Sequence, residues 1–334
     1  MEQGNICWGM IGCGDVTEVK NGPGLYKARH SMLRGVTNRT LSRAEDWVRR
    51  HGAGRVYPSV EALLADPAID IVYVATTPDC HKRYAVQVAQ AGKHCYLEKP
   101  IALNYQEAVE IQQAFQKSGT QIYVAHYRRG MERFKAIREM LDSGEIGQIR
   151  GMQVEYQQQM TDAERLPADQ QPWRVRGEHS GGGHFFEGGI HQLDLMDFLL
   201  GPIEHFSLEV ENRSGFYQAE DMVSLTARTR TGALISGLWL YDAPWDRDEM
   251  RIFGTRGTVR FGYWDNESPI RVETAQGERS FAPPVPPDVG TAQIQDIVNA
   301  LRGEGSCSST LEAAMRSLRI TDASIAQFRS QYSG

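Results

Sequence analysis

The sequence predicts two architectures in one chain: a doubly wound α/β half with a parallel sheet, then an α+β half with mostly antiparallel strands. Two observations predict this. Over the first 125 residues short apolar segments alternate with helical ones, whereas later strands follow one another through turns without long helices between them. The length of 334 residues also favours two domains, since single cores stop growing at about 250 to 300 residues. We therefore expect domains over residues 1–125 and 126–334.

The first half contains five candidate strands separated by helical segments. Short apolar runs predict strands at residues 6–11, 32–37, 69–75, 94–97 and 121–125. Helical patterns occupy residues 42–51, 59–64, 80–91 and 105–118. Helices of this length between strands indicate crossover connections, and therefore a parallel sheet with both faces covered.

The second half has a different pattern. A helix over residues 131–143 precedes strands at 148–158, 203–213, 221–228, 233–240, 250–253 and 257–261. Short turn signals join most of these strands, which is typical of antiparallel pairing. A proline-rich loop over residues 281–290 precedes helical patterns at 291–302 and 311–329, so we read it as a loop within the domain.

Composition and charge exclude several classes of function. The formal net charge is −6, and no basic stripe follows the chain, so we expect no nucleic-acid partner. No apolar run approaches the roughly 18 residues of a membrane span, and the first strand begins without a charged leader before it. The five cysteines lack C-x-x-C spacing, which indicates reduced thiols. We expect a cytoplasmic protein with no membrane partner.

A glycine-rich turn follows the first strand directly. Gly12 permits a tight turn, and Gly14 lets a pyrophosphate approach the backbone N–H groups of Asp15 and Val16 at a helix N-terminus. Thr17 stands where a third glycine is usual, and the shortened motif alone is as compatible with a structural turn. Its position after the first strand of a β-α-β series favours dinucleotide binding.

The end of the second strand indicates which dinucleotide binds. A carboxylate at this position would accept hydrogen bonds from the ribose hydroxyls of NAD, and the sequence has none there. Asn38, Arg39 and Arg43 instead offer an amide and two guanidiniums, which suit a 2′-phosphate. The arginines are also compatible with a solvated helix start. We expect NADP(H) to be preferred, with NAD(H) possible.

The third and fourth strands also end in candidate cofactor-binding residues. Thr76 and Pro78 follow the third strand, where the proline stops the strand and directs the threonine toward the dinucleotide. His81 is either part of this site or a helix cap. Glu98 and Lys99 follow the fourth strand, at a carboxyl end where open α/β sheets bind ligands. A lone lysine here is usually just exposed, but the neighbouring motifs favour a role in the site.

The strongest cluster of candidate residues follows a run of glycines. If the chain is helical from about Gly188, then Glu187, His191, Asp194 and Phe198 fall within an arc of about 60° on one face. Carboxylates beside an imidazole orient the ring and support its charged form, which a proton acceptor requires. A histidine that bridges helices is the structural alternative. A metal site would need a further ligand that the sequence does not identify, so we expect none.

These elements together resemble a known family. The glycine-rich turn, Glu-Lys-Pro at residues 98–100, Trp173-Arg174, glycines at 181–183 and an acid-x-x-x-His-x-x-Asp element occur in the order typical of the Gfo/Idh/MocA family. The resemblance implies a Rossmann domain followed by a domain with a large, mostly antiparallel open sheet. It also implies homodimers or homotetramers formed through that sheet, and Trp173 and Arg174 reaching over the cofactor.

The same resemblance implies a catalytic pair, Lys99 and His191, and a sugar, polyol or keto-sugar substrate. Hydride would pass between nicotinamide and a substrate carbon, while His191 moves the hydroxyl proton and Lys99 stabilises the developing charge on the oxygen. Asp194 would orient His191 or a substrate hydroxyl. Glu187 departs from the family, which usually has aspartate there. Further candidates for the pocket wall are Tyr127, Arg128, His184 and Tyr241.

Two other functions share this scaffold. One is a glycoside-cleaving enzyme that retains its NAD and oxidises the sugar transiently. The other is a dinucleotide-binding regulator without catalytic activity, and such proteins commonly lack the lysine–histidine pair. The presence of Lys99 and His191 argues against the regulator, whereas exchange of the bound cofactor would separate the other two functions.

Overall fold

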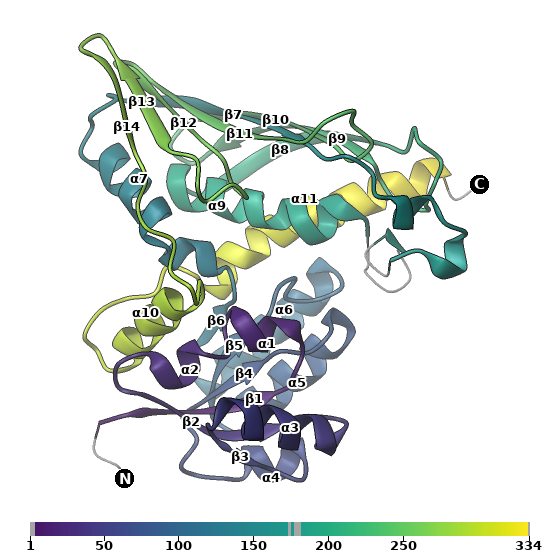
Figure 1. The fold of residues 1–334 in the computed structure, drawn as a ribbon, viewed down its shortest axis with the longest axis vertical. Coiled ribbons are helices and arrows are strands. Elements are labelled where there is room, and N and C mark those ends of the chain that lie inside the picture. Colours follow the sequence, from purple (N-terminus) through teal and green to yellow (C-terminus); the bar gives the residue numbers. More distant parts are fainter. Residues whose placement is uncertain (1–3, 173–174, 177–181, 333–334) are drawn as a thin grey trace. The chain divides into compact units, whose positions relative to one another are not determined.

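The structure is a computed structural model that describes residues 4–172, 175–176 and 182–332 (Figure 1). The chain forms two compact units. The first comprises Met1–Met131 with Pro286–Met315, and the second comprises Glu132–Val285 with Arg316–Gly334. The domain division expected from the sequence, near residue 125, stays a prediction; by packing, the segment Pro286–Met315 groups with the first unit.

A six-stranded parallel sheet forms the centre of the first unit. Its strand order is β3-β2-β1-β4-β5-β6. The strands are β1 (Ile6–Ile11), β2 (Ser31–Thr37), β3 (Arg55–Val56), β4 (Ile71–Val74), β5 (His94–Leu97) and β6 (Ile122–Val124). Each neighbouring pair is parallel. The five predicted strands are confirmed, whereas the two-residue β3 was not anticipated because so short a segment carries no periodic signal.

Helices connect these strands and cover the sheet. They are α1 (Asp15–Val19), α2 (Gly24–Lys27), α3 (Leu41–His51), α4 (Val60–Leu64), α5 (Pro78–Gln90), α6 (Tyr105–Ser118), the 3-10 helix η1 (Tyr127–Gly130) and α10 (Thr291–Leu301). Local signals set their ends. The side chain of Asn104 caps α6 by accepting from the N–H of Glu107, and Gly119 ends that helix in the left-handed conformation.

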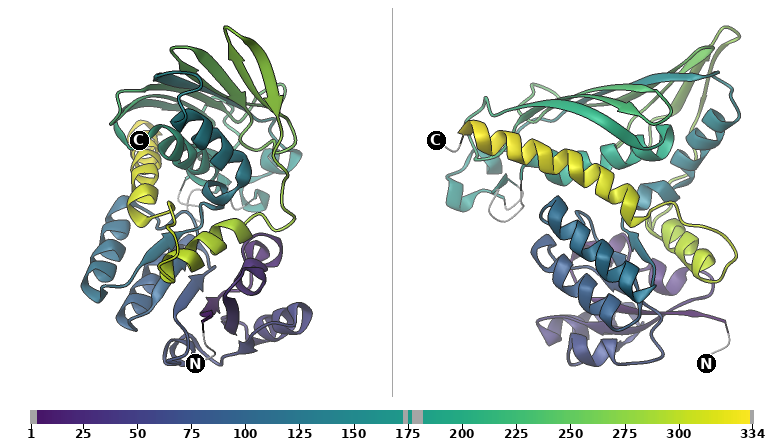
Figure 2. Two further views of the ribbon diagram at one scale, coloured as in Figure 1. Left: turned by 90° about the vertical axis from the view of Figure 1, so that its left-hand side faces the viewer. Right: turned by 180° about the vertical axis from the view of Figure 1, so that it is seen from behind.

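The core of the first unit lies on the sheet. Trp8, Tyr73 and Tyr96 are fully buried, and they belong to one cluster with Ile294 and Val298 of α10. Helices α5 and α6 pack side by side (Figure 2). The strand order reverses between β1 and β4, which creates a switch point where open α/β sheets bind ligands.

An eight-stranded sheet dominates the second unit. Its order is β14-β13-β12-β11-β7-β10-β9-β8, and only the pair β7 and β10 is parallel. The strands are β7 (Ile149–Gln157), β8 (Ile203–Glu211), β9 (Met222–Thr229), β10 (Leu234–Leu240), β11 (Arg247–Gly254), β12 (Gly257–Phe261), β13 (Ile270–Thr274) and β14 (Gly277–Phe281). The predicted fold class, a parallel Rossmann-type sheet followed by a large, mostly antiparallel sheet, is confirmed.

Two strands of this sheet were missed from the sequence. β14 reads Gly-Glu-Arg-Ser-Phe and is exposed along nearly its whole length, so it carries no apolar alternation. β13 alternates buried and exposed residues, but over only five positions. Both are held by pairing with a neighbouring strand, which is a tertiary effect that a single segment does not encode.

The helices of the second unit position its candidate residues. They are α7 (Glu132–Asp142), the 3-10 turns η2 (Asp162–Arg165) and η3 (Ala168–Gln170), the π-helix η5 (Phe185–Gly189), α9 (Ile190–Leu200) and α11 (Leu311–Tyr332). In α9, Gln192 accepts from the indole of Trp239 in β10 over 2.6 Å, and Asp197 forms two hydrogen bonds with Arg316 of α11. Helix α9 is thereby anchored on one side to the sheet and on another to α11 (Figure 1).

Two further observations concern the whole set of described residues. Among them, no helix combines the length and the apolar character needed to cross a membrane. All five cysteines are free thiols.

Candidate active site

The turn after β1 has the geometry that the glycine motif predicts. Gly12 has a φ of 102°, and a Cβ atom there would lie 2.3 Å from the carbonyl oxygen of Ala75. Gly14 precedes α1 with an ordinary φ of −93°, and a Cβ there would meet no atom within 4 Å. Of these two glycines, only Gly12 is therefore needed for the backbone conformation of the turn.

Thr17 takes the place of a third glycine within this turn. Its side chain is fully buried, and its hydroxyl donates to the carbonyl oxygen of Gly14 over 2.7 Å. The threonine thus closes the turn by a hydrogen bond. Asp15 is exposed and Val16 half-buried at the start of α1.

The end of β2 presents polar side chains to solvent. Asn38 donates to the carbonyl oxygen of Thr40 over 3.0 Å. Arg39 and Arg43 are exposed, and neither side chain makes a hydrogen bond or ion pair within the described residues. Burial raises the pKa of the Cys13 thiol to about 12, while the charges of Arg50 and Arg43 oppose the rise.

The loop after β4 is cross-linked to the loop after β5. His81 is fully buried in α5, and its two ring nitrogens lie 2.9 Å from the carbonyl oxygen of Thr76 and 2.8 Å from that of Pro100. Burial lowers the pKa of His81, against the opposing effect of these carbonyl groups. The hydroxyl of Thr76 is buried without a hydrogen-bond partner within the described residues, and Pro78 begins α5.

The candidate lysine follows a tightly held glutamate. Glu98 is 6% exposed, and its Oε1 accepts from Asn21 Nδ2 over 2.7 Å and from the hydroxyl of Tyr73 over 2.5 Å. Its Oε2 accepts from the N–H of Lys99 over 3.2 Å. The backbone that carries Lys99 is therefore fixed by a hydrogen-bonded carboxylate.

Sequence reasoning missed the two residues that hold Glu98. Asn21 lies in the loop after α1, and Tyr73 is the third residue of an apolar strand, where its hydroxyl gives no signal of its own. Burial and the charge of Glu98 raise the pKa of Tyr73 well above its usual range, so its hydroxyl remains a donor. The pairing joins segments 52 and 77 residues apart along the chain.

The first unit also contains two of the weaker pocket candidates. Tyr127 and Arg128 are both buried in η1, and the guanidinium of Arg128 lies 5.5 Å from the centre of the Tyr127 ring. The ammonium of Lys20 lies 6.0 Å from the same ring.

In the second unit, the candidate histidine lies in the first turn of α9. His191 is 7% exposed and Asp194 is 2% exposed. The spacing of His191, Asp194 and Phe198 within one α-helix places them on one face, as predicted. Glu187 lies instead in the π-helix η5, so the regular α-helical angle used for the prediction does not extend to it.

Two aromatic residues that the sequence analysis did not select pack near His191. The imidazole lies 5.6 Å from the ring of Trp264 at an angle of 85°, and 6.3 Å from the ring of Tyr263. Two consecutive aromatic residues after β12 are the sequence signal that could have identified them. They give His191 an apolar surrounding on that side.

Two of the pocket candidates lie together in this unit. The ring of His184 stacks on that of Tyr241, with centres 5.0 Å apart and an angle of 22°. His184 Nε2 lies 2.5 Å from Glu164 Oε1. Burial would raise the pKa of Glu164, but the hydrogen bonds with His184 and Thr161 lower it overall.

The structure thus gathers the predicted residues into two groups, each within its own unit. At the carboxyl edge of the parallel sheet lie the residues that follow β1, β2, β4 and β5: Gly12, Gly14, Asn38, Arg39, Thr76, Glu98 and Lys99. The second group begins immediately before η5, continues through η5 and α9, and includes the residue after β10: His184, Glu187, His191, Asp194 and Tyr241. Trp173 and Arg174 lie outside the described residues. Across residues 4–172, 175–176 and 182–332, no group of three or more metal-binding side chains is arranged around an ion site.

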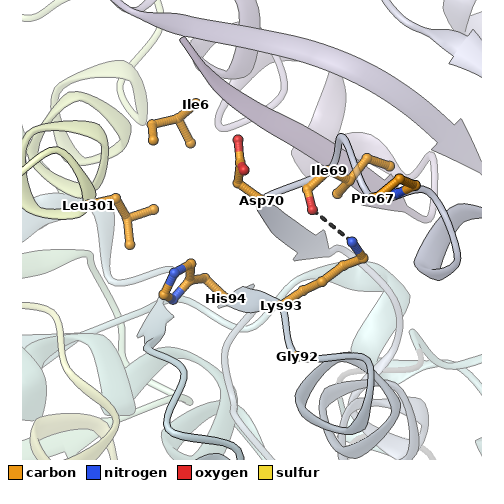
Figure 3. Close-up of a pocket in the computed structure, with 8 residues that line it drawn as sticks. All are labelled: Ile6, Pro67, Ile69, Asp70, Gly92, Lys93, His94 and Leu301. Carbon is orange, nitrogen blue, oxygen red and sulfur yellow. Dashed lines mark hydrogen bonds between the residues drawn. The ribbon is translucent and has the colours of Figure 1, made fainter. Parts of the chain in front are cut away.

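A cavity of about 360 Å³ lies at the opposite edge of the parallel sheet (Figure 3). It is lined by Lys93 and His94 at the amino end of β5, and by Asp70 before β4. The ammonium of Lys93 donates to two carbonyl groups, those of Asp66 and Ile69, over 2.8 and 2.7 Å. The ammonium of Lys93 thus supports the backbone, and the cavity lies away from the carboxyl edge where such sheets bind ligands.

Comparisons with known proteins agree with both halves of the fold. The family described as an oxidoreductase family with an NAD-binding Rossmann fold matches residues 6–126, and the GFO/IDH/MocA C-terminal domain matches residues 134–260. Oxidoreductase P35 of Formosa agariphila is 33% identical over 96% of this chain and 98% of its own length. The 1,5-anhydro-D-fructose reductase of Ensifer adhaerens is 26% identical over 93% of this chain and 92% of its own.

A solved structure of levoglucosan dehydrogenase, in complex with NADH and levoglucosan, has the same fold. The two structures match with a TM-score of 0.84 over 98% of each chain, and the two sequences are 20% identical. The chain therefore belongs to the Gfo/Idh/MocA family of oxidoreductases, whose amino-terminal domain is an NAD-binding Rossmann fold.

Proposed function

We propose that the protein is an NAD(P)-dependent dehydrogenase or reductase that transfers hydride between nicotinamide and a sugar, polyol or keto-sugar. The observation that carries the proposal is Lys99, which follows the buried, hydrogen-bonded Glu98 at the carboxyl end of β5. Relatives named for action on 1,5-anhydro-D-fructose and levoglucosan support a sugar-like substrate. An ammonium in such a position stabilises negative charge on a substrate oxygen.

The residues at the carboxyl edge fit a dinucleotide. The tight turn at Gly12 and the open position at Gly14 allow a pyrophosphate to approach the backbone N–H groups that begin α1. Thr76 follows β4, on the other side of the switch point. Its buried hydroxyl is a hydrogen-bond donor available to the dinucleotide. When bound, the nicotinamide supplies or accepts the hydride, and the protein's residues handle the oxygen and its proton.

The roles proposed for the side chains follow from their chemistry. Lys99 donates a hydrogen bond to the reacting oxygen, and His191 takes its proton during oxidation or returns it during reduction. Asp194, buried on the same helical face as His191, orients the imidazole or a substrate hydroxyl. Glu187 has a less direct role, because it lies in the π-helix before α9.

We propose NADP(H) as the preferred cofactor. Arg39 and Arg43 make no ion pair within the described residues and follow β2, where the ribose 2′ position is recognised in this fold. The first turn of α3 has no acidic residue that would repel a 2′-phosphate. Two guanidiniums therefore remain for charge-assisted contacts.

We further propose that residues 126–334 bind the substrate and mediate a homodimer or homotetramer. Leu234 and Leu238 of β10 support the assembly, because they are 62% and 39% exposed on one face of the large sheet. Analytical ultracentrifugation of the parent and of Leu238→Lys tests this. A parent that sediments as a monomer contradicts the proposal.

A screen for turnover tests the proposed function. The substrates are levoglucosan, 1,5-anhydro-D-fructose, myo-inositol and L-sorbose, here called the polyol panel, each assayed with both cofactors by nicotinamide absorbance. We expect turnover of at least one compound, with an oxidation rate that rises with pH. His191→Asn should remove the pH dependence and lower the rate by about 10² to 10⁴-fold. A cofactor that is never released to solvent during turnover would instead favour the glycoside-cleaving enzyme.

A further inference from the structure

We propose that Glu164, His184, Tyr217 and Tyr241 form a subsite, the tyrosine subsite, that binds a non-reacting hydroxyl group of the sugar or polyol. The proposal rests on the proposed function and deepens it, because it assigns residues to substrate recognition. All four residues belong to the second unit. His184 and Tyr241 were expected only as pocket walls, and no pattern in the sequence indicated Glu164 or Tyr217.

The first part of the subsite is a histidine whose ring is oriented by a buried carboxylate. Glu164 is 4% exposed, and its Oε2 accepts from the N–H of Thr161 over 2.7 Å and from its hydroxyl over 2.9 Å. Its Oε1 lies 2.5 Å from His184 Nε2. A carboxylate that accepts at both oxygens is ionised, so Nε2 carries the hydrogen and donates.

The orientation of His184 leaves its other nitrogen for a ligand. With Nε2 as the donor to Glu164, Nδ1 faces a ligand, as an acceptor in the neutral ring and as a donor in the charged ring. Nδ1 makes no hydrogen bond within the described residues, and the side chain is 12% exposed. Glu164 is therefore a positioning residue, and His184 is the group that contacts the ligand.

The second part of the subsite consists of two phenol groups. Tyr241 is 3% exposed and stacks on the imidazole of His184, whereas Tyr217 is 4% exposed and meets it edge-on, with ring centres 6.1 Å apart. Both hydroxyl oxygens are buried without a hydrogen-bond partner within the described residues. Burial raises the pKa of both tyrosines, so each hydroxyl keeps its hydrogen and remains a donor.

The two buried phenol hydroxyls without hydrogen-bond partners need an explanation. An unmade hydrogen bond of a buried group costs about 1 to 3 kcal/mol, and native structures have few such groups. A hydroxyl group can donate to Nδ1 of His184 and accept from a phenol at the same time. A hydroxyl group therefore satisfies Nδ1 in either form of the ring, because it both donates and accepts.

The framework around the subsite is rigid. Glu220 is buried and accepts from the N–H of Gly183 over 3.0 and 3.1 Å and from that of Phe186 over 3.3 Å. A Cβ at Gly183 would lie 2.8 Å from a Glu220 oxygen. These contacts fix the segment that presents His184, immediately before η5.

An electrostatic contact links the subsite to a proposed catalytic residue. The charge of Glu187 contributes to the raised pKa of Tyr241, after the effects of burial, Tyr156, Glu220 and Tyr217. The subsite and Glu187 therefore lie within electrostatic reach of each other in the same unit. Recognition of a second hydroxyl near this position would orient the substrate for reaction at another carbon.

Single-atom changes test the subsite. Tyr241→Phe and Tyr217→Phe remove only the unsatisfied hydroxyls. Tyr156→Phe is the matched control, because its ring lies 5.8 Å from that of Tyr241 but its hydroxyl already donates to Gln158 over 3.0 Å. Isothermal titration calorimetry measures Kd for each compound of the polyol panel, thermal melting measures Tm, and steady-state assays give KM and kcat separately.

We expect each subsite variant to raise the Kd and KM of the bound polyol by about tenfold, the effect of one lost hydrogen bond, with kcat within about twofold. Its Tm should be unchanged or higher, because an unsatisfied buried donor has been removed. Tyr156→Phe should leave Kd unchanged and lower Tm slightly. Unchanged Kd and KM in both subsite variants would overturn the proposal and indicate that bound water alone satisfies the tyrosines.

The calorimetry separates this proposal from the proposed function. Binding that weakens only in the subsite variants, without any turnover in the parent, supports the subsite and contradicts the dehydrogenase. Turnover with unchanged KM in the variants supports the dehydrogenase and overturns the subsite. A parent protein that binds no compound of the polyol panel also overturns the subsite.

Discussion

Tyr73 donates its phenolic hydrogen to Glu98 over 2.5 Å, inside the core of the first unit. The tyrosine lies in β4 and the glutamate immediately after β5, so the bond joins two neighbouring strands at their carboxyl ends. Asn21 donates to the same oxygen of Glu98, and Glu98 in turn accepts from the N–H of Lys99. The position of the Lys99 backbone therefore depends on the buried hydrogen bonds among Asn21, Tyr73 and Glu98.

Removal of the Tyr73 hydroxyl should destabilise the first unit. Tyr73→Phe leaves a buried carboxylate oxygen with one donor fewer, so we expect the free energy of unfolding to fall by about 2 kcal/mol. Urea denaturation measures the change. Tyr84→Phe is the control, because the hydroxyl of Tyr84 makes no hydrogen bond within the described residues, and its stability should match the parent's. A Tyr73→Phe protein as stable as the control would show that the network is not needed.

The two glycines of the first turn should respond differently to alanine. Gly12→Ala places a Cβ at 2.3 Å from a carbonyl oxygen at a φ of 102°, so we expect a loss of stability of more than about 1 kcal/mol. Gly14→Ala meets no protein atom within 4 Å and should fold normally while it weakens dinucleotide binding. Thermal melting and fluorescence titration with NADH and NADPH measure the two effects. Equal dinucleotide affinity in Gly14→Ala and the parent would contradict the placement of the pyrophosphate.

The cofactor preference should depend on Arg39. We expect the parent to bind NADPH more tightly than NADH, and Arg39→Ala to reduce that ratio by about tenfold through the loss of a charge-assisted contact. Arg150→Ala is the control, since Arg150 is an exposed arginine in the second unit. Titrations that show a clear preference of the parent for NADH would refute the NADP(H) assignment.

Acid should weaken the contact between α1 and α3 in a defined pH range. Hydrogen bonds from Arg50, and then from His51, lower the pKa of Glu18 to about 2 against the opposing effect of burial. A folded-state pKa below the usual value of 4.5 means that the charged form stabilises the fold. The contribution is full above a pH of about 4.5 and is lost as the pH falls through about 2.

Glu18→Gln should therefore lower the free energy of unfolding by about 1 kcal/mol at neutral pH, since the pair remains partly hydrated. The difference from the parent should vanish near pH 2. Denaturation curves at a series of pH values measure it, with Glu45→Gln as a control at an exposed position of α3. A difference that persists unchanged into acid would contradict the ion pair.

The sequence predicted the fold where one periodicity dominates. β1 and β5 have the predicted limits, because each is a short apolar run bounded by turns, and α6 agrees because Asn104 and Gly119 mark both of its ends. The exposed strand β14 was missed, since only its neighbour in the sheet holds it in place. The π-helix before α9 was also missed, because glycines at its end resemble an ordinary helix start.

The residues of the candidate site also differ in whether a local sequence pattern identified them. Glu98 and Lys99 were found because they follow a strand, and His191 because of its acidic neighbours on one helical face. Asn21 and Tyr73 were not found, since their contacts with Glu98 join positions far apart in the sequence. The pairing of Glu164 with His184, 20 residues away, depends likewise on the packing of loops that no local pattern encodes.

The turnover of Lys99→Ala tests the central claim most directly. With a compound of the polyol panel that the parent converts, we expect kcat to fall by about two to three orders of magnitude, while the Kd for the dinucleotide changes less than about threefold. Lys117→Ala, at an exposed position of α6, should retain parental values of both. A Lys99→Ala protein whose kcat stays within a few-fold of the parent's would contradict the proposal that this lysine stabilises charge on the reacting oxygen.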